Sequence, residues 1–315
     1  MIKTAPHSAG QALLIILLVM AVALTIGLSV IARSITDIAI SQKEEEAARA
    51  FSVAEAGIEQ ALIGTGTGDV TGTLSLGSFT ATRSDLVTSG GKTFVHPQTL
   101  SVGESASIWL VGHDSNGVVD CSGSLSCFKT SSSGVSPLKF CWGKPGTETD
   151  TGNSATWPAL EIMLLYTTGS GDYSTAKVAR AAFDPNTTRQ GTNGFAAPDS
   201  GTCTIGSENF AFKRTINLED LVSSPNERTS ESSDTGPQVV RVRLFYNSLQ
   251  THPFGIDTSG NTCSDCGKLP QQGTKILSTG TAGSATRKLE VYKLYADLPS
   301  IFDYALFSGT GGIVK

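Results

Sequence analysis

Charged residues are scarce in this sequence, and basic residues never gather into a stripe. Asp, Glu, Lys and Arg together make up 16% of the 315 residues, and the net charge is −5. Proteins that bind nucleic acid neutralise phosphates with clustered Lys and Arg, so the sequence argues against a nucleic-acid partner. Glycine is abundant instead, at 34 residues, which favours a β-rich, extracytoplasmic domain with many turns.

Signatures of catalysis and of cofactor binding are missing as well. The sequence contains no G-x-S-x-G, no H-E-x-x-H and no glycine loop with the lysine that would cradle a phosphate. The histidines (His7, His96, His113 and His252) are scattered along the chain. A catalytic triad assembles in space, so spacing does not decide that question. We nevertheless expect no enzyme, no cofactor and no metal site.

Residues 11–32 form the one long apolar run of the chain. The run reads QALLIILLVMAVALTIGLSVIA and carries no charge. As a helix it would reach roughly 33 Å, enough to cross a hydrocarbon core of about 30 Å. The sequence therefore predicts a transmembrane helix here. Lys3 precedes the run while Arg33, Lys43 and Arg49 follow it, so the positive charges do not by themselves fix its orientation.

The helical pattern continues through residues 33–63, now with one apolar side. Apolar positions recur at spacings of three and four, at Ala47, Ala50, Phe51, Ala54, Ile58, Ala61 and Leu62. Gly64, Gly66 and Gly68 then end the helix. Because the stripe is mostly alanine, it permits close approach of a sheet or of another helix. It can pack against the chain's own β domain, in a bundle of several chains, or in both at different turns.

The N-terminal fifth of the chain resembles a known family. Three phrases carry the resemblance: Gly10 followed by Ala12-Leu13-Leu14, Arg33-Ser34 at the end of the apolar run, and Ala50-Phe51 followed by Ala54-Glu55-Ala56. This region is similar to that of PilX-type minor pilins and, more distantly, of K-type pseudopilins of type II secretion. The resemblance implies a long helix, half of it in the membrane, and a subunit that joins or initiates a type IV pilus-like fibre.

The sequence departs from the usual pilin pattern at its start. Ordinary pilins have Phe or Met after the cleaved glycine and Glu four residues later, whereas this chain has Gln11 and Ile15. Residues 1–10 are therefore either a prepilin-like leader, cut between Gly10 and Gln11 or retained, or the start of a secretory signal peptide cut near Ala32. The apolar run exceeds the 7–15 residues usual for a signal peptide. We favour retention of the helix.

Residues 64–315 change character and predict strands. Period-two runs separated by Gly, Pro, Asn and Ser clusters indicate strands near 74–82, 93–96, 98–102, 106–112, 138–142, 160–167, 177–183, 210–216, 239–246 and 287–295. Long loops are expected at about 113–136, 143–158, 184–208, 223–237 and 256–284. The fold class predicted is α+β, with a long N-terminal helix followed by a large antiparallel β-sandwich or jelly-roll-like domain. We do not expect the small four-stranded sheet of a simple pilin.

All the cysteines lie beyond the apolar run, at Cys121, Cys127, Cys141, Cys203, Cys263 and Cys266. An even number on one side of a membrane segment predicts up to three disulfides in an oxidising compartment, with free buried thiols as the alternative. Spacing does not choose among the pairings, although Cys121/Cys127 and Cys263/Cys266 could each close a loop. The second pair also has the spacing of half a zinc or redox site, but no second C-x-x-C completes it.

Two further features have ordinary structural explanations. Asp114 to Asp120 (DSNGVVD) places oxygen ligands on a turn, but the spacing differs from that of a calcium loop, so we expect a hairpin turn. Trp109, Trp142 and Trp157 are expected to pack in the core or at strand ends rather than to form a platform for sugars.

These observations lead to one expectation and one alternative for function. The first is a structural minor pilin-like subunit, held in the membrane before assembly, with its C-terminal domain outside the cytoplasm. Small residues on the helix (Ala21, Ala23 and Gly27) and stalk residues (Phe51, Ala54 and Ile58) would pack against other pilin-like subunits. The alternative is a membrane-anchored adhesin or ligand-binding β domain that never enters a fibre.

Overall fold

The computed structural model describes residues 9–64, 66–75, 77–87, 90–114, 116–121, 127–130, 136–147, 154–168, 173–221, 236–262 and 266–297. The chain divides into two compact units. Unit 1 comprises the N-terminal helix with Gly68–Arg83 and Ile276–Val291, and unit 2 comprises Ser84–Lys275 with the chain from Tyr292 onward. Unit 2 is therefore an insertion: the chain leaves unit 1 after its second strand and returns to it nearly two hundred residues later.

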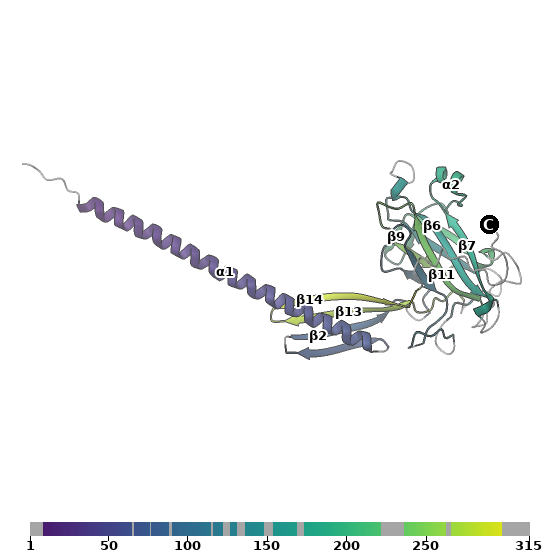
Figure 1. The fold of residues 1–315 in the computed structure, drawn as a ribbon, viewed down its shortest axis with the longest axis horizontal. Coiled ribbons are helices and arrows are strands. Elements are labelled where there is room, and N and C mark those ends of the chain that lie inside the picture. The colour runs from purple at the N-terminus through teal and green to yellow at the C-terminus, as the bar shows by residue number, and fades with distance from the viewer. Residues whose placement is uncertain are drawn as a thin grey trace, which may run out of the picture. The chain divides into compact units, whose positions relative to one another are not determined.

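Helix α1 (Ala9–Ile63) is continuous through both of the segments that the sequence predicts to be helical (Figure 1). It has no break at Arg33, where the apolar run ends, because no Gly or Pro interrupts the ladder from Leu28 to Gln60 except Gly57. The helix ends just before Gly64, and Gly66 and Gly68 follow it with φ of 79° and 128°. The predicted end of the helix is confirmed.

The last turns of α1 lie on a four-stranded sheet in unit 1 (Figure 1). The strands are hydrogen-bonded in the order β1-β2-β13-β14. Their bounds are β1 (Gly68–Leu74), β2 (Gly77–Asp85), β13 (Gly273–Ala282) and β14 (Ala285–Leu294). The expectation that the chain has no small four-stranded sheet is therefore wrong, because one of this size lies beside the helix in unit 1. Its central pair joins strands that are almost two hundred residues apart, which local periodicity does not reveal.

Helix and sheet meet through very small residues. Ala50, Ala54 and Ala61 have no exposed surface, and Ile58 retains 8%. Along β13 every second residue from Ile276 to Ala282 is buried, as expected for a strand with one covered face. The core of unit 1 consists of Val53, Ile58, Ala61, Phe79, Ala81 and Ile276. Of the packings left open for the alanine-rich stripe, the structure shows the one against the chain's own β structure.

Unit 2 contains two larger antiparallel sheets and a small hairpin. The first sheet has the order β10-β5-β12-β3 and the second has the order β4-β11-β6-β7. The bounds are β3 (Thr93–Val95), β4 (Ser105–Trp109), β5 (Pro137–Trp142), β6 (Ala159–Thr167), β7 (Ala176–Phe183), β10 (Phe212–Asn217), β11 (Gly236–Phe245) and β12 (Phe254–Asp257). The hairpin pairs β8 (Cys203–Ile205) with β9 (Glu208–Phe210), and the short helices are α2 (Thr187–Asn193), α3 (Leu218–Leu221), η1 (Ser154–Thr156) and η2 (Tyr173–Thr175).

One cluster of buried side chains serves both large sheets of unit 2. It includes Phe140, Trp142 and Phe254 from the first sheet, and Ile162 and Val242 from the second. Alternation along the strands directs these residues to one side, because successive side chains of a strand point to opposite faces. The coarse prediction of an α+β protein, a long helix followed by antiparallel sheets, is confirmed.

Several predicted strands agree with the structure and others do not. The strands expected near 93–96, 138–142, 160–167, 177–183, 239–246 and 287–295 correspond to β3, β5, β6, β7, β11 and β14. The strand expected at 74–82 begins too early: it includes the turn between β1 and β2 and then the first part of β2. The strand at 98–102 reduces to a single bridge between Leu100 and His252. The loop expected at 256–284 is also wrong, since it contains the end of β12 and all of β13.

Candidate functional site

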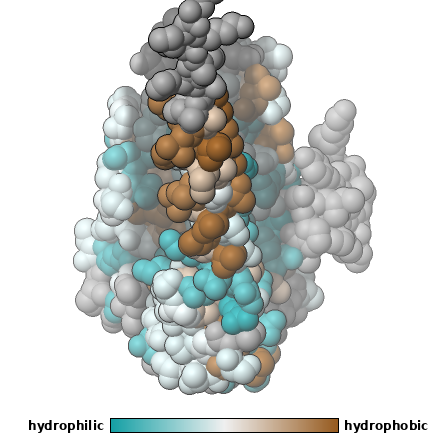
Figure 2. All heavy atoms as spheres, turned by 90° about the vertical axis from the view of Figure 1, so that its left-hand side faces the viewer, coloured by the Kyte–Doolittle hydropathy of each residue, from teal (hydrophilic) through white to brown (hydrophobic). Residues whose placement is uncertain are grey.

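From Ala12 to Glu45 every residue of α1 is exposed. The large apolar side chains that lie exposed along this segment are Leu13, Leu14, Ile15, Ile16, Leu17, Leu18, Val19, Met20, Val22, Leu24, Ile26, Leu28, Val30, Ile31, Ile35, Ile38 and Ile40. Figure 2, which looks toward this end of the helix, shows them as a brown surface. Among the described residues α1 is the one helix long and apolar enough to cross a membrane, although a signal sequence would pass the same test. The helix is compatible with a single-pass membrane anchor.

The small residues predicted to mediate helix packing lie on this uncovered segment. Ala21, Ala23 and Gly27 are exposed, and a Cβ built on Gly27 would meet no atom within 4 Å. A neighbouring helix could therefore approach the backbone closely at these positions, which is the use that membrane helices make of small residues.

The residues predicted for processing lie at the start of α1. Gly10 and Gln11 belong to its first turn, which begins at Ala9. Residues 1–8 of the predicted leader (residues 1–10) lie outside the described residues, as does the side chain of Gln11.

The stalk residues predicted to pack divide between two faces of the helix. Ala54 and Ile58 are buried against the sheet of unit 1, whereas Phe51 is 43% exposed. Phe51 is thus not part of the contact that the helix makes with its own sheet. Val53 and Gly57 are buried in this contact instead. They were not predicted, because the expected stripe was drawn through the alanine positions.

An apolar stripe extends beyond the membrane-length run. Ile31, Ile35 and Ile38 follow one another at spacings of four and three, so they share one face of α1. Ile35 is 63% exposed and Ile38 is 56% exposed, and both come after Arg33, where the uncharged run has ended. A bilayer that ends near Arg33 would leave these side chains in water, so this stretch is the part of the helix that most needs a protein partner.

A polar contact fixes the helix to the β13–β14 turn within unit 1. One carboxylate oxygen of Glu46 accepts hydrogen bonds from the hydroxyl and the backbone N–H of Ser284, at 2.8 and 2.9 Å. These two donors, the hydroxyl first, hold the pKa of Glu46 below its ordinary value. Gly283, which precedes Ser284, has a φ of 57° that suits the tight turn.

The cysteines form disulfides in unit 2. Cys121 is bonded to Cys127, one of the two close pairs that could each close a loop, and Cys141 is bonded to Cys203. Cys266 is also disulfide-bonded, whereas Cys263 lies outside the described residues. The Cys141–Cys203 bond joins strand β5 to strand β8, and its neighbours Ile205 and Phe210 form a small core around it. Spacing could not predict this bond, because 62 residues separate its ends.

The Asp114 segment forms a tight turn. A carboxylate oxygen of Asp114 accepts hydrogen bonds from the backbone N–H groups of Asn116 and Val118, at 2.9 and 2.8 Å. His113 and Val119 then pair in an isolated bridge. The side chain therefore serves the turn, and among the described residues no group of three or more His, Cys, Asp or Glu is placed to hold a metal ion.

The aromatic and histidine side chains of unit 2 mostly serve packing. Trp142 and Trp157 are buried, and Trp109 meets the ring of His113 edge to face at 4.6 Å. His252 has no exposed surface, and its Nδ1 accepts a hydrogen bond from the backbone N–H of Lys144. Burial, together with the charge of Lys144, lowers the pKa of His252 to about 4, so the ring is neutral at pH 7.

Comparison with known proteins adds no relative. No protein-family model, curated protein or solved structure matches this chain. Function must therefore be argued from the helix, its sheet and the inserted unit themselves.

Proposed function

We propose that this chain is a structural, minor pilin-like subunit of a type IV pilus or related fibre. The observation that carries the proposal is the division of α1 into two parts. Its last turns, with Ala50, Ala54 and Ala61, are buried on a sheet of the same chain, while the residues from Ala12 to Glu45 are exposed and leave an apolar surface of membrane length uncovered. A permanent anchor needs only the membrane-length run, whereas α1 carries its exposed apolar stripe beyond Arg33, to Ile38.

The proposed mechanism has two steps. Before assembly, burial in the bilayer holds the subunit at the membrane, with its C-terminal units outside the cytoplasm. During assembly, the helix exchanges lipid for the helices of neighbouring subunits. Lipid tails are as apolar as leucine, so the exchange is driven by close packing rather than by the hydrophobic effect. Gly27 and the neighbouring alanines supply the small surface that such packing uses, and Ile35 and Ile38 gain apolar contacts that they lack in the single chain.

We further propose that the two large sheets of unit 2 form a β-sandwich head. Support comes from the single buried cluster that both sheets share. The Cys141–Cys203 bond would strengthen such a head outside the cell, where disulfides persist.

A second candidate is a membrane-anchored adhesin or ligand-binding domain that stays outside any fibre. The observation in its favour is the size of unit 2, which far exceeds the sheet that α1 needs for its own packing. The two candidates differ in the fate of the helix, because an anchor remains in lipid and a fibre subunit leaves it.

Fibre shearing distinguishes the two candidates. The full chain would be expressed in the organism that encodes it, fibres would be sheared from the cells, and the fibre and membrane fractions would be probed for the protein. We expect wild-type protein in the sheared fibres, and we expect the Ile35→Asn/Ile38→Asn double variant only in the membrane fraction. The matched control is Leu249→Asn. Leu249 is an apolar residue about as exposed as Ile35 (67% against 63%), but it belongs to unit 2.

Two outcomes would contradict the proposal. If fibres carry none of the wild-type protein while membranes do, the anchored adhesin is the better description. If mass spectrometry of the mature protein shows that it begins near Arg33, the helix acts as a cleaved signal and the assembly role fails. A mature start at Gln11 would instead agree with the proposal and show that the leader is cut.

A further inference from the structure

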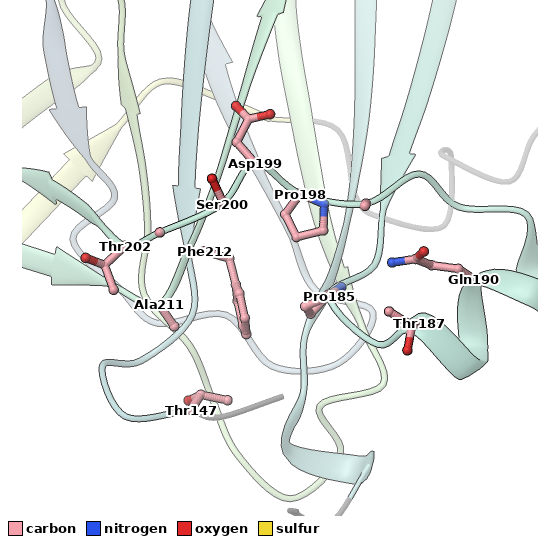
Figure 3. Close-up of a pocket in the computed structure, with 12 residues that line it drawn as sticks. Thr147, Pro185, Thr187, Gln190, Pro198, Asp199, Ser200, Thr202, Ala211 and Phe212 are labelled. Carbon is pink, nitrogen blue, oxygen red and sulfur yellow. The ribbon is translucent and has the colours of Figure 1, made fainter. Parts of the chain in front are cut away.

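Unit 2 contains a polar groove that the proposed assembly role does not use. It has a volume of about 530 Å³, within the range of roughly 300–1,000 Å³ usual for small-molecule sites. Figure 3 shows its walls: the segment with Pro198, Asp199 and Ser200 on one side, helix α2 with Thr187 and Gln190 on another, and Phe212 between them. These walls come from parts of the chain that lie on the surface of unit 2.

Helix α2 is fixed beside the groove by a buried ion pair. Asp184 has no exposed surface, and its carboxylate accepts hydrogen bonds from Arg189 at 2.7 and 2.9 Å. The same carboxylate accepts further bonds from the Asn193 side chain and from the backbone N–H of Asn186. A seven-residue helix is too short to be stable alone. This network holds it in one position, and therefore also holds Thr187 and Gln190.

The opposite wall is fixed at several points. The backbone N–H of Asp199 donates to the carbonyl of Lys213 at 2.8 Å, and the N–H of Asp184 donates to the carbonyl of Ala196 at 2.9 Å. Cys203, at the end of the segment, is held by its disulfide to Cys141. A loop tied at its start, middle and end presents a preformed surface, which reduces the entropy that a ligand must overcome.

The hydroxyl groups of the groove are not used by the described residues, whereas the side chain of Gln190 donates to the carbonyl of Asp184 at 2.6 Å. The hydroxyls of Thr147, Thr187, Ser200 and Thr202 line it, and none of them makes a hydrogen bond to any other described residue. Elsewhere in unit 2 exposed hydroxyls do find partners, as Thr204 does with Asn209 at 2.7 Å. A hydroxyl can donate and accept at the same time, so four of them in one hollow match a ligand that is itself rich in hydroxyl groups.

The charge of the groove is already balanced. Asp199 is its one lining carboxylate, and it is paired with Arg214 at 3.0 Å and with the backbone N–H of Thr215 at 2.8 Å. No Lys or Arg is among the lining residues, although Lys213 lies beside Gly201 at the edge. The lining therefore favours an uncharged ligand over a phosphate or a carboxylate.

Apolar rings complete the lining. Phe212, Pro185 and Pro198 lie together between the hydroxyl-bearing walls in Figure 3. Phe212 is mostly buried and packs against Trp142 with ring centroids 5.8 Å apart, so its position is fixed from behind. A sugar ring presents C–H groups on its faces and hydroxyls around its edge, which is the same division of apolar and polar surface.

We propose that this groove binds a neutral saccharide, recognised by the side-chain hydroxyls of Thr147, Thr187, Ser200 and Thr202 around the rings of Phe212, Pro185 and Pro198. The inference is independent of fibre assembly, because every residue involved belongs to unit 2 and none belongs to α1. If both proposals hold, the subunit carries a saccharide site on its inserted unit.

The test measures binding of neutral oligosaccharides to the full chain. The protein would be purified in a detergent without a sugar headgroup, since maltosides and glucosides would compete for the groove. Maltotriose, cellotriose, chitotriose and lactose serve as neutral probes, and sialyllactose as the anionic probe, each followed by saturation-transfer NMR and titration. We expect at least one neutral probe to bind, and the Thr187→Val/Thr202→Val variant to bind it at least about tenfold more weakly, because two hydrogen bonds are lost.

Two controls make the test selective. Thr71→Val removes an exposed hydroxyl from β1 in unit 1 and should leave binding within about twofold of wild type. Ala197→Trp places a large ring in the groove and should abolish binding while leaving the disulfides and thermal unfolding of unit 2 intact. Binding by none of the neutral probes, binding by sialyllactose alone, or equal binding by wild type and the double Val variant would overturn the proposal.

Discussion

Replacement of Gly280 by alanine tests the contact between α1 and its sheet. Gly280 lies in β13 opposite the turn of α1 that contains Ala50 and Ala54. A Cβ added to Gly280 would approach the carbonyl oxygen of Ala50 and the backbone N–H of Ala54 more closely than any normal contact. These are backbone atoms of a helix, so they cannot rotate away as a flexible side chain would. The helix must move as a unit to accommodate one methyl group.

The expected cost follows from two opposing effects. Overpacking of a well-filled core typically costs about 1–3 kcal/mol, and the backbone obstacle places this site at the upper end. Alanine also restricts the conformations of the unfolded chain more than glycine does, which increases the free energy of unfolding by about 0.4–1 kcal/mol. Gly280 has no positive φ, so that gain applies here. The net loss of stability is about 2 kcal/mol, which corresponds to roughly a 30-fold larger opening equilibrium.

Hydrogen exchange of the full chain in micelles gives a local measurement. In the Gly280→Ala variant we expect amides of β13 and of the last turns of α1 to exchange roughly 30-fold faster, with amides of β6 and β11 unchanged. Gly191→Ala is the control, because a Cβ there meets nothing within 4 Å and improves the propensity of helix α2. If protection in β13 is the same in the variant and the wild type, the close approach of helix and sheet is not a stabilising contact.

Two further predictions concern unit 2. His252 has a folded-state pKa of about 4, below its ordinary 6.5, so between these pH values the unfolded chain binds more protons than the folded chain, and stability is lost as pH falls from about 6.5 to about 4. Urea unfolding followed by tryptophan fluorescence should show that this group lowers the free energy of unfolding by about 3 kcal/mol over that range. The His252→Asn variant should lack this pH-dependent loss. An unchanged pH dependence in His252→Asn would show that another group is responsible. Asp184→Asn removes the charge of a fully buried carboxylate, leaves the partly buried Arg189 without its charge partner and should destabilise unit 2 by about 3 kcal/mol. Glu45→Gln, which breaks an exposed pair with Arg49, should cost well under 1 kcal/mol. Equal melting temperatures for Asp184→Asn and wild type would argue against the network as the support of α2.

The helix was readable from the sequence because its signals are local. The uncharged run, the alanine spacing from Ala47 to Ala61 and the glycines after Ile63 each lie within a few turns, and together they predict α1 almost to the residue. The same holds for strands with strong alternation, such as Val240 to Leu244 in β11. The spacing of Cys121 and Cys127 allowed a bond across a short loop without selecting it among the possible pairings.

The parts that the sequence did not reveal depend on distant partners. β13 reads GTKILSTGTA, a segment of small and hydroxylated residues that periodicity assigns to a loop. Gly280 and Ser278 of this strand must be small because α1 packs directly against them. The helix residues that impose this limit lie more than two hundred positions earlier in the sequence. The groove in unit 2 was not predicted for the same reason. In the sequence nothing distinguishes Thr147, Thr187 and Thr202 from other polar residues, and only the fold brings them together.

The insertion explains how unit 1 can keep its helix and sheet while carrying so large a unit. In unit 2 the departing and returning ends of the chain lie side by side, because the N–H of Leu86 donates to the carbonyl of Gly273 at 3.1 Å. Gly273 has a φ of 144°, and a Cβ there would collide with backbone atoms of Lys293 and Leu294, so only glycine allows the returning strands to approach this closely. To the sheet of unit 1, the insertion is therefore equivalent to a single connection between neighbouring strands. Loop closure adds only about 0.6 kcal/mol for each doubling of a flexible loop, and a folded insertion with adjacent ends adds less. Unit 2 can thus acquire a binding surface without altering the contacts of Ala50, Ala54 and Gly280.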